Sequence, residues 1–187
     1  HGQPAPLTQE PVELQGRSLQ ADKVVVAIGH PALAAPVDVA PELATARMVR
    51  FKLPGSVPAG LASVWLRASS AAGDVEWTTN RLPLLVAPTI TSQLPMNVVR
   101  ANGRAEITLS FRPRLVGKQD TSVVVGSRVV PVHKVADNRL SATFRIENAV
   151  PGRFMLRLRI DGVDSRLVAD RSAIPPAFDA TQAVTVA

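Results

Sequence analysis

The residues that could bind a metal or act as a general base are few and lie far apart. The three histidines, His1, His30 and His133, have no His-x-x-x-His spacing and no cluster of acids beside them. This pattern does not favour a zinc site or a proton-transfer site, and we expect exposed loop positions for these histidines. The chain also has no Cys, which excludes disulfides, thiolate chemistry and Cys-ligated zinc.

Nucleophilic and phosphate-binding motifs are missing as well. A serine nucleophile for acyl transfer is commonly exposed by a Gly-x-Ser-x-Gly turn. None of Ser63, Ser69, Ser70 and Ser110 stands in such a turn sequence. The sequence has no glycine-rich loop that could hold a phosphate. We therefore predict that the chain is not an enzyme and needs no cofactor.

Three aspartates near the C-terminus are spaced loosely like calcium ligands, and they are Asp161, Asp164 and Asp170. Asp161 is followed by Gly162, and Asp-Gly between two alternating apolar runs is the signal of a tight β-hairpin turn. Because the turn explains this pair without an ion, we predict no metal site.

An arginine-rich strand is a candidate for contact with a partner. Arg153, Arg157 and Arg159 alternate with apolar residues, so they share one face of a strand and form a candidate protein-docking site. This face could bind an acidic neighbouring subunit or a cell-surface polymer. Nucleic acid is disfavoured, because no groove-reading helix accompanies the arginines.

A second basic face and its acids allow a simpler interpretation. We expect Arg112 and Arg145 on the outer face of the opposite sheet, where Glu106 and Glu147 could form cross-strand ion pairs. In that case the arginines serve solubility rather than docking. Both interpretations stay open at the level of sequence.

Two tryptophans complete the candidate docking residues. Trp65 is predicted to face outward from its strand, and Trp77 to lie in the loop before Asn80. An exposed Trp can anchor a protein interface. Alternatively, these rings cover a sheet edge or wedge against the second half of the chain near Pro88.

Composition indicates a chain of β-strands that presents surfaces. The 187 residues are 46% hydrophobic and include 16 Pro and 11 Gly, which suits short strands and tight turns. Aromatic residues make up only 4%, so no stacking surface for single-stranded nucleic acid is evident. No apolar run reaches the roughly 20 residues of a membrane helix. The chain starts at His1 without an initiator Met, and we expect a processed or cut chain.

The formal charge of +6 is unevenly distributed. Residues 1–88 carry seven basic and seven acidic side chains, whereas residues 89–187 carry fourteen basic and eight acidic ones. All of the net charge therefore lies in the second half, as a basic surface that is either solvated or complementary to an acidic partner.

Alternation with a period of two predicts half-buried antiparallel strands in both halves. A short helix over 41–46 is a further expectation, since Pro41 suits a first helical turn, and residues 170–181 are predicted to be a loop. The predicted strands are 11–14, 23–28, 47–53, 61–68, 82–86, 106–112, 122–132, 141–147, 153–160 and 182–186.

The segment from Asn80 to Ile90 separates two similar halves. An apolar strand ends before Pro88, which has no N–H, and a new strand begins at Thr89. The segments 57–61 and 150–154 both carry a Val-Pro turn before an alternating strand, at an offset of about 92 residues. This is the size of one immunoglobulin-like sandwich. The sequence predicts an all-β fold of two tandem immunoglobulin-like antiparallel β-sandwiches, with a lead-in at 1–6 and domains at 7–88 and 89–187.

Several motifs resemble a known module. The segment 12–19, Val-Glu-Leu-Gln-Gly-Arg-Ser-Leu, resembles the opening of an IPT/TIG-type (E-set) immunoglobulin-like module, and the segments 57–66 and 79–90 resemble its later strands. The order of these motifs, followed by the run at 151–165 that ends in Ile-Asp-Gly-Val-Asp-Ser, resembles the C-terminal half of tail-terminator (cap) proteins of phage-tail-like contractile injection systems. The collar domain that carries capping in that family has no counterpart here.

This resemblance implies a non-catalytic accessory region that acts as a spacer or docking arm. Its expected partners are neighbouring subunits of a tail-like particle, with cytoplasmic assembly, and no nucleic acid or membrane span. The alternative is an adhesion or glycan-associated TIG module of a bacterial surface protein or secreted hydrolase, which would be extracellular.

Overall fold

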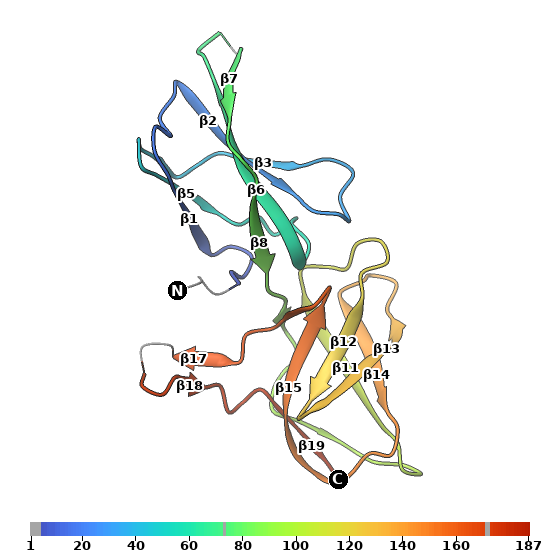
Figure 1. Ribbon diagram of the computed structural model, residues 1–187. Coiled ribbons are helices and arrows are strands. Elements are labelled where there is room, and N and C mark those ends of the chain that lie inside the picture. Colours follow the sequence, from blue (N-terminus) through green and yellow to red (C-terminus); the bar gives the residue numbers. More distant parts are fainter. Residues whose placement is uncertain (1–4, 73, 171–172) are drawn as a thin grey trace. The chain divides into compact units, whose positions relative to one another are not determined.

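The computed structural model describes residues 5–72, 74–170 and 173–187, and it consists of β-strands joined by turns and loops (Figure 1). No helix occurs among the described residues, so the all-β prediction is confirmed. In particular, none of these segments is a long apolar helix of the kind that crosses a bilayer. The chain divides into two compact units, His1–Val86 and Ala87–Ala187, here called unit 1 and unit 2.

Unit 1 is built from two sheets. The strands of the smaller sheet, in the order β1-β5-β4, are β1 (Pro11–Gln15), β4 (Leu43–Ala44) and β5 (Met48–Lys52). The larger sheet has the order β3-β2-β6, and both β7 and β8 pair with β6. Its strands are β2 (Lys23–Gly29), β3 (Val37–Val39), β6 (Gly60–Ser69), β7 (Val75–Thr78) and β8 (Leu82–Val86).

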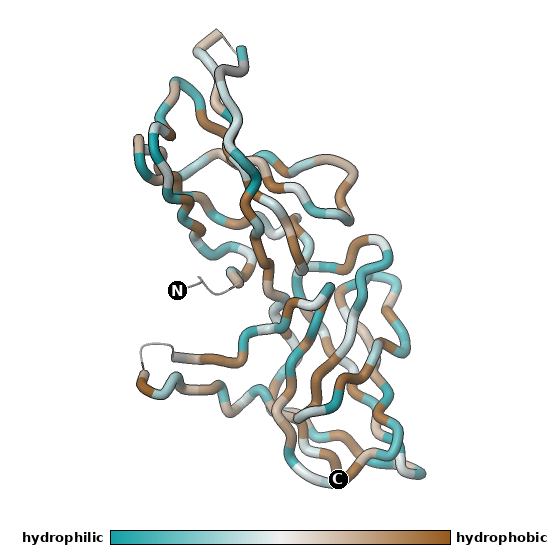
Figure 2. The backbone as a smooth tube through the Cα atoms, viewed as in Figure 1, coloured by the Kyte–Doolittle hydropathy of each residue, from teal (hydrophilic) through white to brown (hydrophobic). Residues whose placement is uncertain are grey.

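The two sheets of unit 1 share one apolar core because their strands alternate in polarity. Val49 and Phe51 of β5 are fully buried, and they belong to the same cluster as Val26 and Ile28 of β2 and Leu66 of β6. The alternation is visible along the backbone in Figure 2. Since side chains from both sheets meet in one cluster, unit 1 is a β-sandwich.

The expected helix at 41–46 does not form. Residues 43–44 instead make the short strand β4, in which Leu43 pairs with Arg50 and Ala44 with Val49. The chain then turns at Thr45, whose Oγ1 accepts a hydrogen bond from the Met48 N–H at 3.0 Å. The prediction was wrong because a Pro at a first helical turn is a weak local signal, whereas the edge of β5 offers backbone partners over this stretch.

Unit 2 forms one continuous series of paired strands in the order β10-β19-β15-β12-β13-β14-β11-β9, with β16 attached to β15. The strands in the first part of the unit are β9 (Thr89–Ile90), β10 (Met96–Val98), β11 (Ala105–Arg112), β12 (Thr121–Val125) and β13 (Arg128–Val135). Those in the later part are β14 (Ser141–Ile146), β15 (Gly152–Ile160), β16 (Val163–Asp164), β17 (Val168–Asp170), β18 (Ala177–Phe178) and β19 (Ala183–Val186).

The strand order of unit 2 is that of an immunoglobulin-like sandwich. The path β9-β11-β14-β13 corresponds to the ABED sheet of such domains, and the path β12-β15-β19 corresponds to the CFG sheet. β13 pairs with β12 on one side and with β14 on the other, and its register with β14 shifts between Val132 and Lys134. The irregular strand β13 thus continues from one sheet into the other, and the core lies between them.

The predicted Asp-Gly hairpin is present between β15 and β16. Asp161 and Gly162 have φ values of 46° and 79°, as a type I′ turn requires at both central positions. Ile160 pairs directly with Val163 across this turn.

The region predicted as a loop at 170–181 contains a strand instead. β17 and β18 pair as a separate two-stranded sheet, with Val168 opposite Phe178. In Figure 1 this hairpin stands apart from the other strands of unit 2. The strand β18 was not predicted from the sequence, because it is very short and directly follows Pro175 and Pro176, which are typical of loops.

Candidate functional site

Trp65 lies on the outer face of β6, opposite the core residues Val64 and Leu66, but it is only 7% exposed. The guanidinium carbon of Arg81 lies 4.3 Å from the centroid of the indole, in cation–π geometry. Gly29 of the neighbouring strand lies against the same ring, since a Cβ there would be 3.1 Å from Trp65 Cζ3. Trp65 therefore lies on the outer face, as the alternation predicted, but its ring is covered by neighbouring residues and is not open to solvent.

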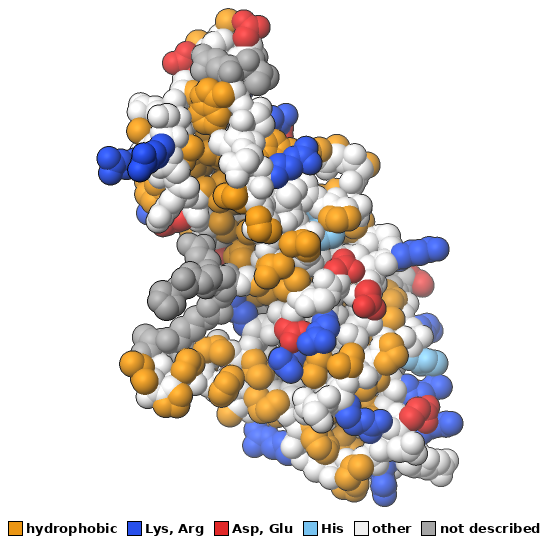
Figure 3. Space-filling view, viewed as in Figure 1, with side chains coloured by type: hydrophobic (Ala, Val, Ile, Leu, Met, Phe, Trp, Pro, Cys, Tyr) orange, Lys and Arg blue, Asp and Glu red, His pale blue; other side chains and the backbone are white. Residues whose placement is uncertain are grey.

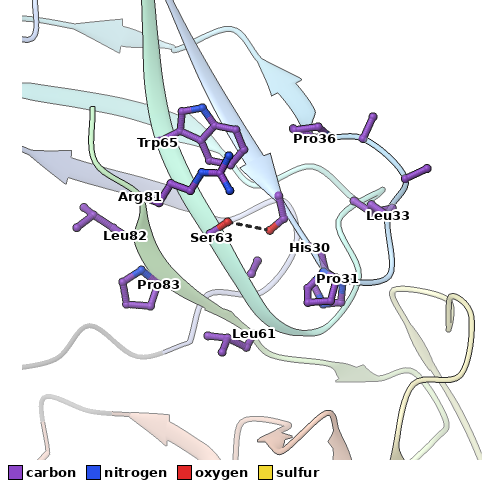
Figure 4. A pocket seen from close by; sticks show the side chains of 14 residues that line it. His30, Pro31, Leu33, Pro36, Leu61, Ser63, Trp65, Arg81, Leu82 and Pro83 are labelled. Atoms are coloured by element: carbon purple, nitrogen blue, oxygen red, sulfur yellow. Dashed lines mark hydrogen bonds between the residues drawn. The ribbon is translucent and has the colours of Figure 1, made fainter. Parts of the chain in front are cut away.

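A groove with a volume of about 540 Å³ lies over this part of unit 1 (Figure 4). The segment after β2 forms one wall, and Leu33 and Pro36 are among its apolar side chains. Leu61 and Trp65 of β6 form the floor, and the start of β8 with Leu82 forms the other wall. The groove is therefore a largely apolar surface between a loop and an edge strand.

The polar groups of the groove are few. The Ser63 hydroxyl donates to the Gly29 carbonyl at 3.5 Å, and His30 Nδ1 accepts from the Ala32 N–H at 3.1 Å. Among the residues that line the groove, Arg81 is the one with a permanent charge. An apolar segment that carries a negative charge would therefore fit the groove best.

Two features of this groove were not predicted from the sequence. His30 was expected in an exposed loop, yet it is only 6% exposed and lines the groove. Arg81 was not singled out, because its partner ring lies on another strand. The Ala/Pro-rich composition of residues 32–36 was the one signal of an apolar wall. His133 is exposed on β13, in a strand rather than a loop, and His1 lies outside the described residues.

Trp77 does not lie in a loop before Asn80. It belongs to β7, where it pairs with Ala68 of β6 and packs, partly buried, against the core of unit 1. The local sequence suggested a loop because the Thr-Thr-Asn that follows is typical of turns. In this position the ring stabilises the sandwich, and its candidate docking role remains a prediction.

The arginines of β15 share one face, but all three are already engaged within unit 2. Arg157 Nη1 donates to Asp164 Oδ2 at 2.9 Å, and Arg159 Nε donates to Asp164 Oδ1 at 2.6 Å. The hydrogen bond and the negative charge of Asp164 raise the pKa of Arg159. Arg153 Nη2 donates to the Ala180 carbonyl at 2.7 Å. This face is therefore less available to an acidic partner than its sequence suggested.

The aspartates that resembled calcium ligands have protein partners. Asp161 accepts hydrogen bonds from Gln119 Nε2 at 2.7 Å and from the Asp120 N–H at 2.8 Å. Asp164 holds the two arginines, and the side chain of Asp170 lies outside the described residues. Within the described part of the chain, no three His or acidic side chains gather as metal ligands would.

Of the two acids predicted to pair with the second basic face, Glu106 does so, whereas Glu147 pairs with a different arginine. Arg145 lies directly opposite Glu106 in the β11–β14 ladder, with Nε 2.9 Å from Glu106 Oε1. Glu147 pairs with Arg104 at 2.7 Å. Arg112 is exposed at the end of β11. These exposed pairs support solubility, and each adds little to stability.

The segment around the β17–β18 hairpin carries two strongly exposed apolar side chains, of which Ile174 is the most exposed large apolar residue described in unit 2. Ile174 is 98% exposed and Phe178 is 64% exposed, and Pro175 and Pro176 between them are exposed as well. Figure 3 shows hydrophobic side chains at the end of this hairpin. A surface of this kind is typical of a contact site for another molecule.

Comparisons with solved structures show weak likeness to modular β-proteins. The FN1–FN3 domains of chicken CNTN1 are similar at 12% identity and a TM-score of 0.35, over 97% of this chain and 64% of that chain. The amphioxus IgVJ-C2 molecule is similar at 15% identity and a TM-score of 0.28, over 85% of this chain and 97% of that chain. Invasin, a bacterial integrin-binding protein, is similar at 11% identity and a TM-score of 0.29, over 95% of this chain and 38% of that chain.

Comparison at the level of sequence identifies the family through unit 2. No curated protein matches the chain. The family described as domain of unknown function (DUF8756) matches residues 88–186, which include every strand from β9 to β19. Because this match covers more than half of the 187 residues, the chain belongs to the DUF8756 family.

Proposed function

We propose that this chain is a non-catalytic interaction module that docks onto a neighbouring subunit through the groove of unit 1. The observation that carries the proposal is the open apolar groove beside edge strand β8. Leu61 and Leu82 at this groove are 53% and 42% exposed although they are large and apolar. Exposed apolar grooves on a sheet face are a common form of protein-binding surface.

The two units would be tandem IPT/TIG-type immunoglobulin-like domains, at 7–88 and 89–187. Supporting this, the order β1-β5-β4 corresponds to B-E-D and the order β2-β6-β8 to C-F-G of the immunoglobulin-like plan, which unit 2 also follows. The Val-Pro segments of the sequence repeat precede β6 and β15, which take the F position in their respective units. Equivalent segments in equivalent strands are what a duplicated module would give.

The specific role we propose is the C-terminal accessory region of a tail-terminator protein of a contractile injection system, assembled in the cytoplasm. The motif order at 12–19, 79–90 and 151–165 supports this role. The groove and the basic surface of unit 2 would act as the docking elements of a spacer arm.

The test combines gene context with binding. If the proposal is right, genes for sheath, tube and baseplate proteins flank the gene, and the full-length protein binds the purified sheath or tube subunit in biolayer interferometry. Leu61→Asp combined with Leu82→Asp should weaken that binding at least about tenfold. Val129→Asp, at a side chain of unit 2 that is 55% exposed, is the matched control and should bind normally.

A gene neighbourhood of polysaccharide-degrading enzymes, together with no binding to sheath or tube subunits, would contradict the proposed role. That result would favour the alternative, a glycan-associated or adhesion module of an extracellular protein.

A further inference from the structure

The strand β8, which forms one wall of the groove, is a free edge of its sheet. β8 pairs with β6 on one side, and no other strand of residues 5–72 and 74–86 pairs with it. The described residues that precede β1, residues 5–10, form no strand. A free edge presents unpaired backbone N–H and C=O groups, which can pair with a strand of another chain.

The last strands of the two units, β8 and β19, can be aligned through a shared feature. In each unit, a glycine with a positive φ begins the strand next to this last strand and lies directly opposite one of its valines. The two pairs are Gly60–Val86 and Gly152–Val186. Leu85 of β8 therefore corresponds to Thr185 of β19.

Unit 2 shows what covers this edge when it is paired. β10 runs parallel to β19 and places Asn97 opposite Thr185. The Ala187 N–H donates to the Val98 carbonyl at 3.0 Å, and the Arg100 N–H donates to the Ala187 carbonyl at 2.8 Å. One parallel strand thus satisfies the edge of β19, and among the described residues unit 1 has no counterpart of it.

The backbone of Leu85 points toward the free side of β8. Alternate residues of β6 direct their backbone groups toward β8, as Leu66 shows by accepting a hydrogen bond from the Thr79 N–H at 3.0 Å. Leu84 pairs with a residue of this set, so the next residue, Leu85, faces away from β6. Pro83 faces away as well, so its missing N–H costs the sheet no bond. Leu85 therefore offers both an N–H and a C=O to an added strand.

The side chains at this edge indicate the chemistry of that strand. Leu85 is 47% exposed, and Leu61, directly opposite on β6, is 53% exposed. Arg81 lies exposed just before β8 and takes part in none of the ion pairs formed by the described residues (Figure 4). An added strand should therefore have apolar side chains on this face and a carboxylate near Arg81.

We propose that the neighbouring subunit adds an extended strand parallel to β8, in the place that β10 takes beside β19. The added strand begins with an acidic residue at Arg81 and bonds to the N–H and C=O of Leu85. This inference rests on the proposed function and specifies how the partner binds: by completing the sheet of unit 1 along the wall of its groove.

Amide hydrogen exchange of the full chain tests the pairing directly. The Leu85 amide should exchange freely in the isolated chain and about tenfold more slowly in complex with the sheath or tube subunit. A short synthetic peptide, with two aspartates followed by alternating Val and Thr, should have the same effect. A peptide with two asparagines in place of the aspartates should bind several-fold more weakly. The amides of β3, at the other edge of the same sheet, are the control and should not change.

Two substitutions at one position separate the backbone from the side chain. Leu85→Pro removes the N–H that faces the partner and should weaken binding of the subunit and of the peptide about tenfold. Leu85→Thr keeps this N–H and introduces the residue that unit 2 has at the corresponding position, so it should bind more tightly than Leu85→Pro. Melting temperatures show whether both variants fold, and the exchange experiment decides alone if Leu85→Pro does not.

Two exchange results would overturn the inference. A Leu85 amide that is protected in the isolated chain would mean that the chain covers the edge itself. Subunit binding that leaves this amide unprotected would overturn the inference and leave the proposed function intact. Protection by the peptide without any binding to sheath or tube subunits would support strand addition and contradict the proposed function. A chain that neither the subunits nor the peptide protect would contradict both.

Discussion

At the scale of single residues, the chemistry of the groove depends on pairs that come from different strands. Trp65 is an outward-facing residue of β6, yet Arg81 covers its face and the missing side chain of Gly29 makes room for its edge. The ring is thereby held in place, and the groove keeps a firm floor. A docking surface with fixed side chains loses less conformational entropy when a partner binds.

Arg81→Gln should uncover the indole of Trp65. The substitution removes the cation over the ring and shortens the side chain that shields it, so stability should fall by about 0.5–1 kcal/mol. Tryptophan emission should shift to longer wavelength, because water gains access to the ring. Both are measured by fluorescence-monitored urea unfolding.

Arg112→Gln removes the same charge from an exposed position of unit 2 and is the control. It should leave the emission maximum unchanged. An Arg81→Gln protein with wild-type emission would show that the cation does not shield the ring.

The carboxyl group of Asp179, at the base of the β17–β18 hairpin, makes the stability of the protein depend on pH. The Thr181 hydroxyl and then the Thr181 N–H donate to its carboxylate, at 2.5 and 2.9 Å, and lower the pKa of Asp179. Because the pKa of Asp179 is lower in the folded than in the unfolded state, its ionised carboxylate stabilises the fold at pH values above the unfolded-state pKa. This stabilisation is lost as the pH falls through the folded-state pKa. We expect Asp179→Asn to be less stable than wild type at pH 7, and the difference to shrink below about pH 4.

Thermal melts of both proteins across this pH range check the prediction, and the effect should be small because the carboxylate is well solvated. Asp137→Asn serves as a control for the loss of one negative charge. A difference between Asp179→Asn and wild type that grows on acidification would contradict the assigned sign.

At the scale of elements, turns and edges decide which strands pair. The Asp-Gly turn fixes the register of β15 and β16, and this register brings Asp164 opposite Arg159. The same placement lets the Ser165 hydroxyl accept a hydrogen bond from the Leu158 N–H at 3.0 Å in a buried position. One local turn thus sets an ion pair and a buried hydrogen bond.

Gly162→Ala should destabilise the protein by about 1 kcal/mol, because Gly162 has a φ of 79°, which L-residues with a Cβ adopt at a cost. No atom lies within 4 Å of the added methyl group, so backbone strain alone accounts for the loss. Urea unfolding measures the change.

Gly55→Ala is the matched control for a turn glycine. Its φ lies outside the left-handed region, and its Cβ would meet only Gln9 Nε2 at 3.6 Å. Stability should be unchanged or slightly higher, since Ala restricts the unfolded chain. Equal losses in the two variants would show that the strain at Gly162 is not the cause.

At the scale of the whole molecule, each unit has its own core. Phe51 is buried among side chains of unit 1, and Phe144 is buried on β14 of unit 2. Two cores in one chain allow the units to unfold separately, and they leave the surfaces proposed for docking on two different bodies.

Phe51→Ala should lower the unfolding temperature of unit 1 and leave that of unit 2 unchanged, and Phe144→Ala should do the reverse. Each truncation of a buried Phe costs about 3–5 kcal/mol in the affected unit. Differential scanning calorimetry should resolve two transitions that respond independently. A single transition shifted equally by both variants would mean that the units unfold together.

The sequence by itself determined the longer strands and the faces of their residues, but not the short strands β4, β7 and β18. Alternation alone places Val49 and Phe51 on one face of the predicted strand 47–53, and Leu156 and Leu158 on one face of 153–160, because a strand places successive side chains on opposite faces whatever its neighbours are. All four side chains are fully buried. The Asp161-Gly162 turn was equally local, since it depends on the backbone preferences of two adjacent residues.

Only the tertiary structure decided how exposed the outward-facing side chains are. The burial of Trp65, the groove beside it, the pairing of β4 with β5 and the sharing of Asp164 by two arginines all depend on segments far apart in the chain. Alternation says which face a residue occupies, but the cover over that face comes from other strands and loops. The physical reason is that burial and ion pairing are properties of the assembled surface, whereas strand phase is a property of the local backbone.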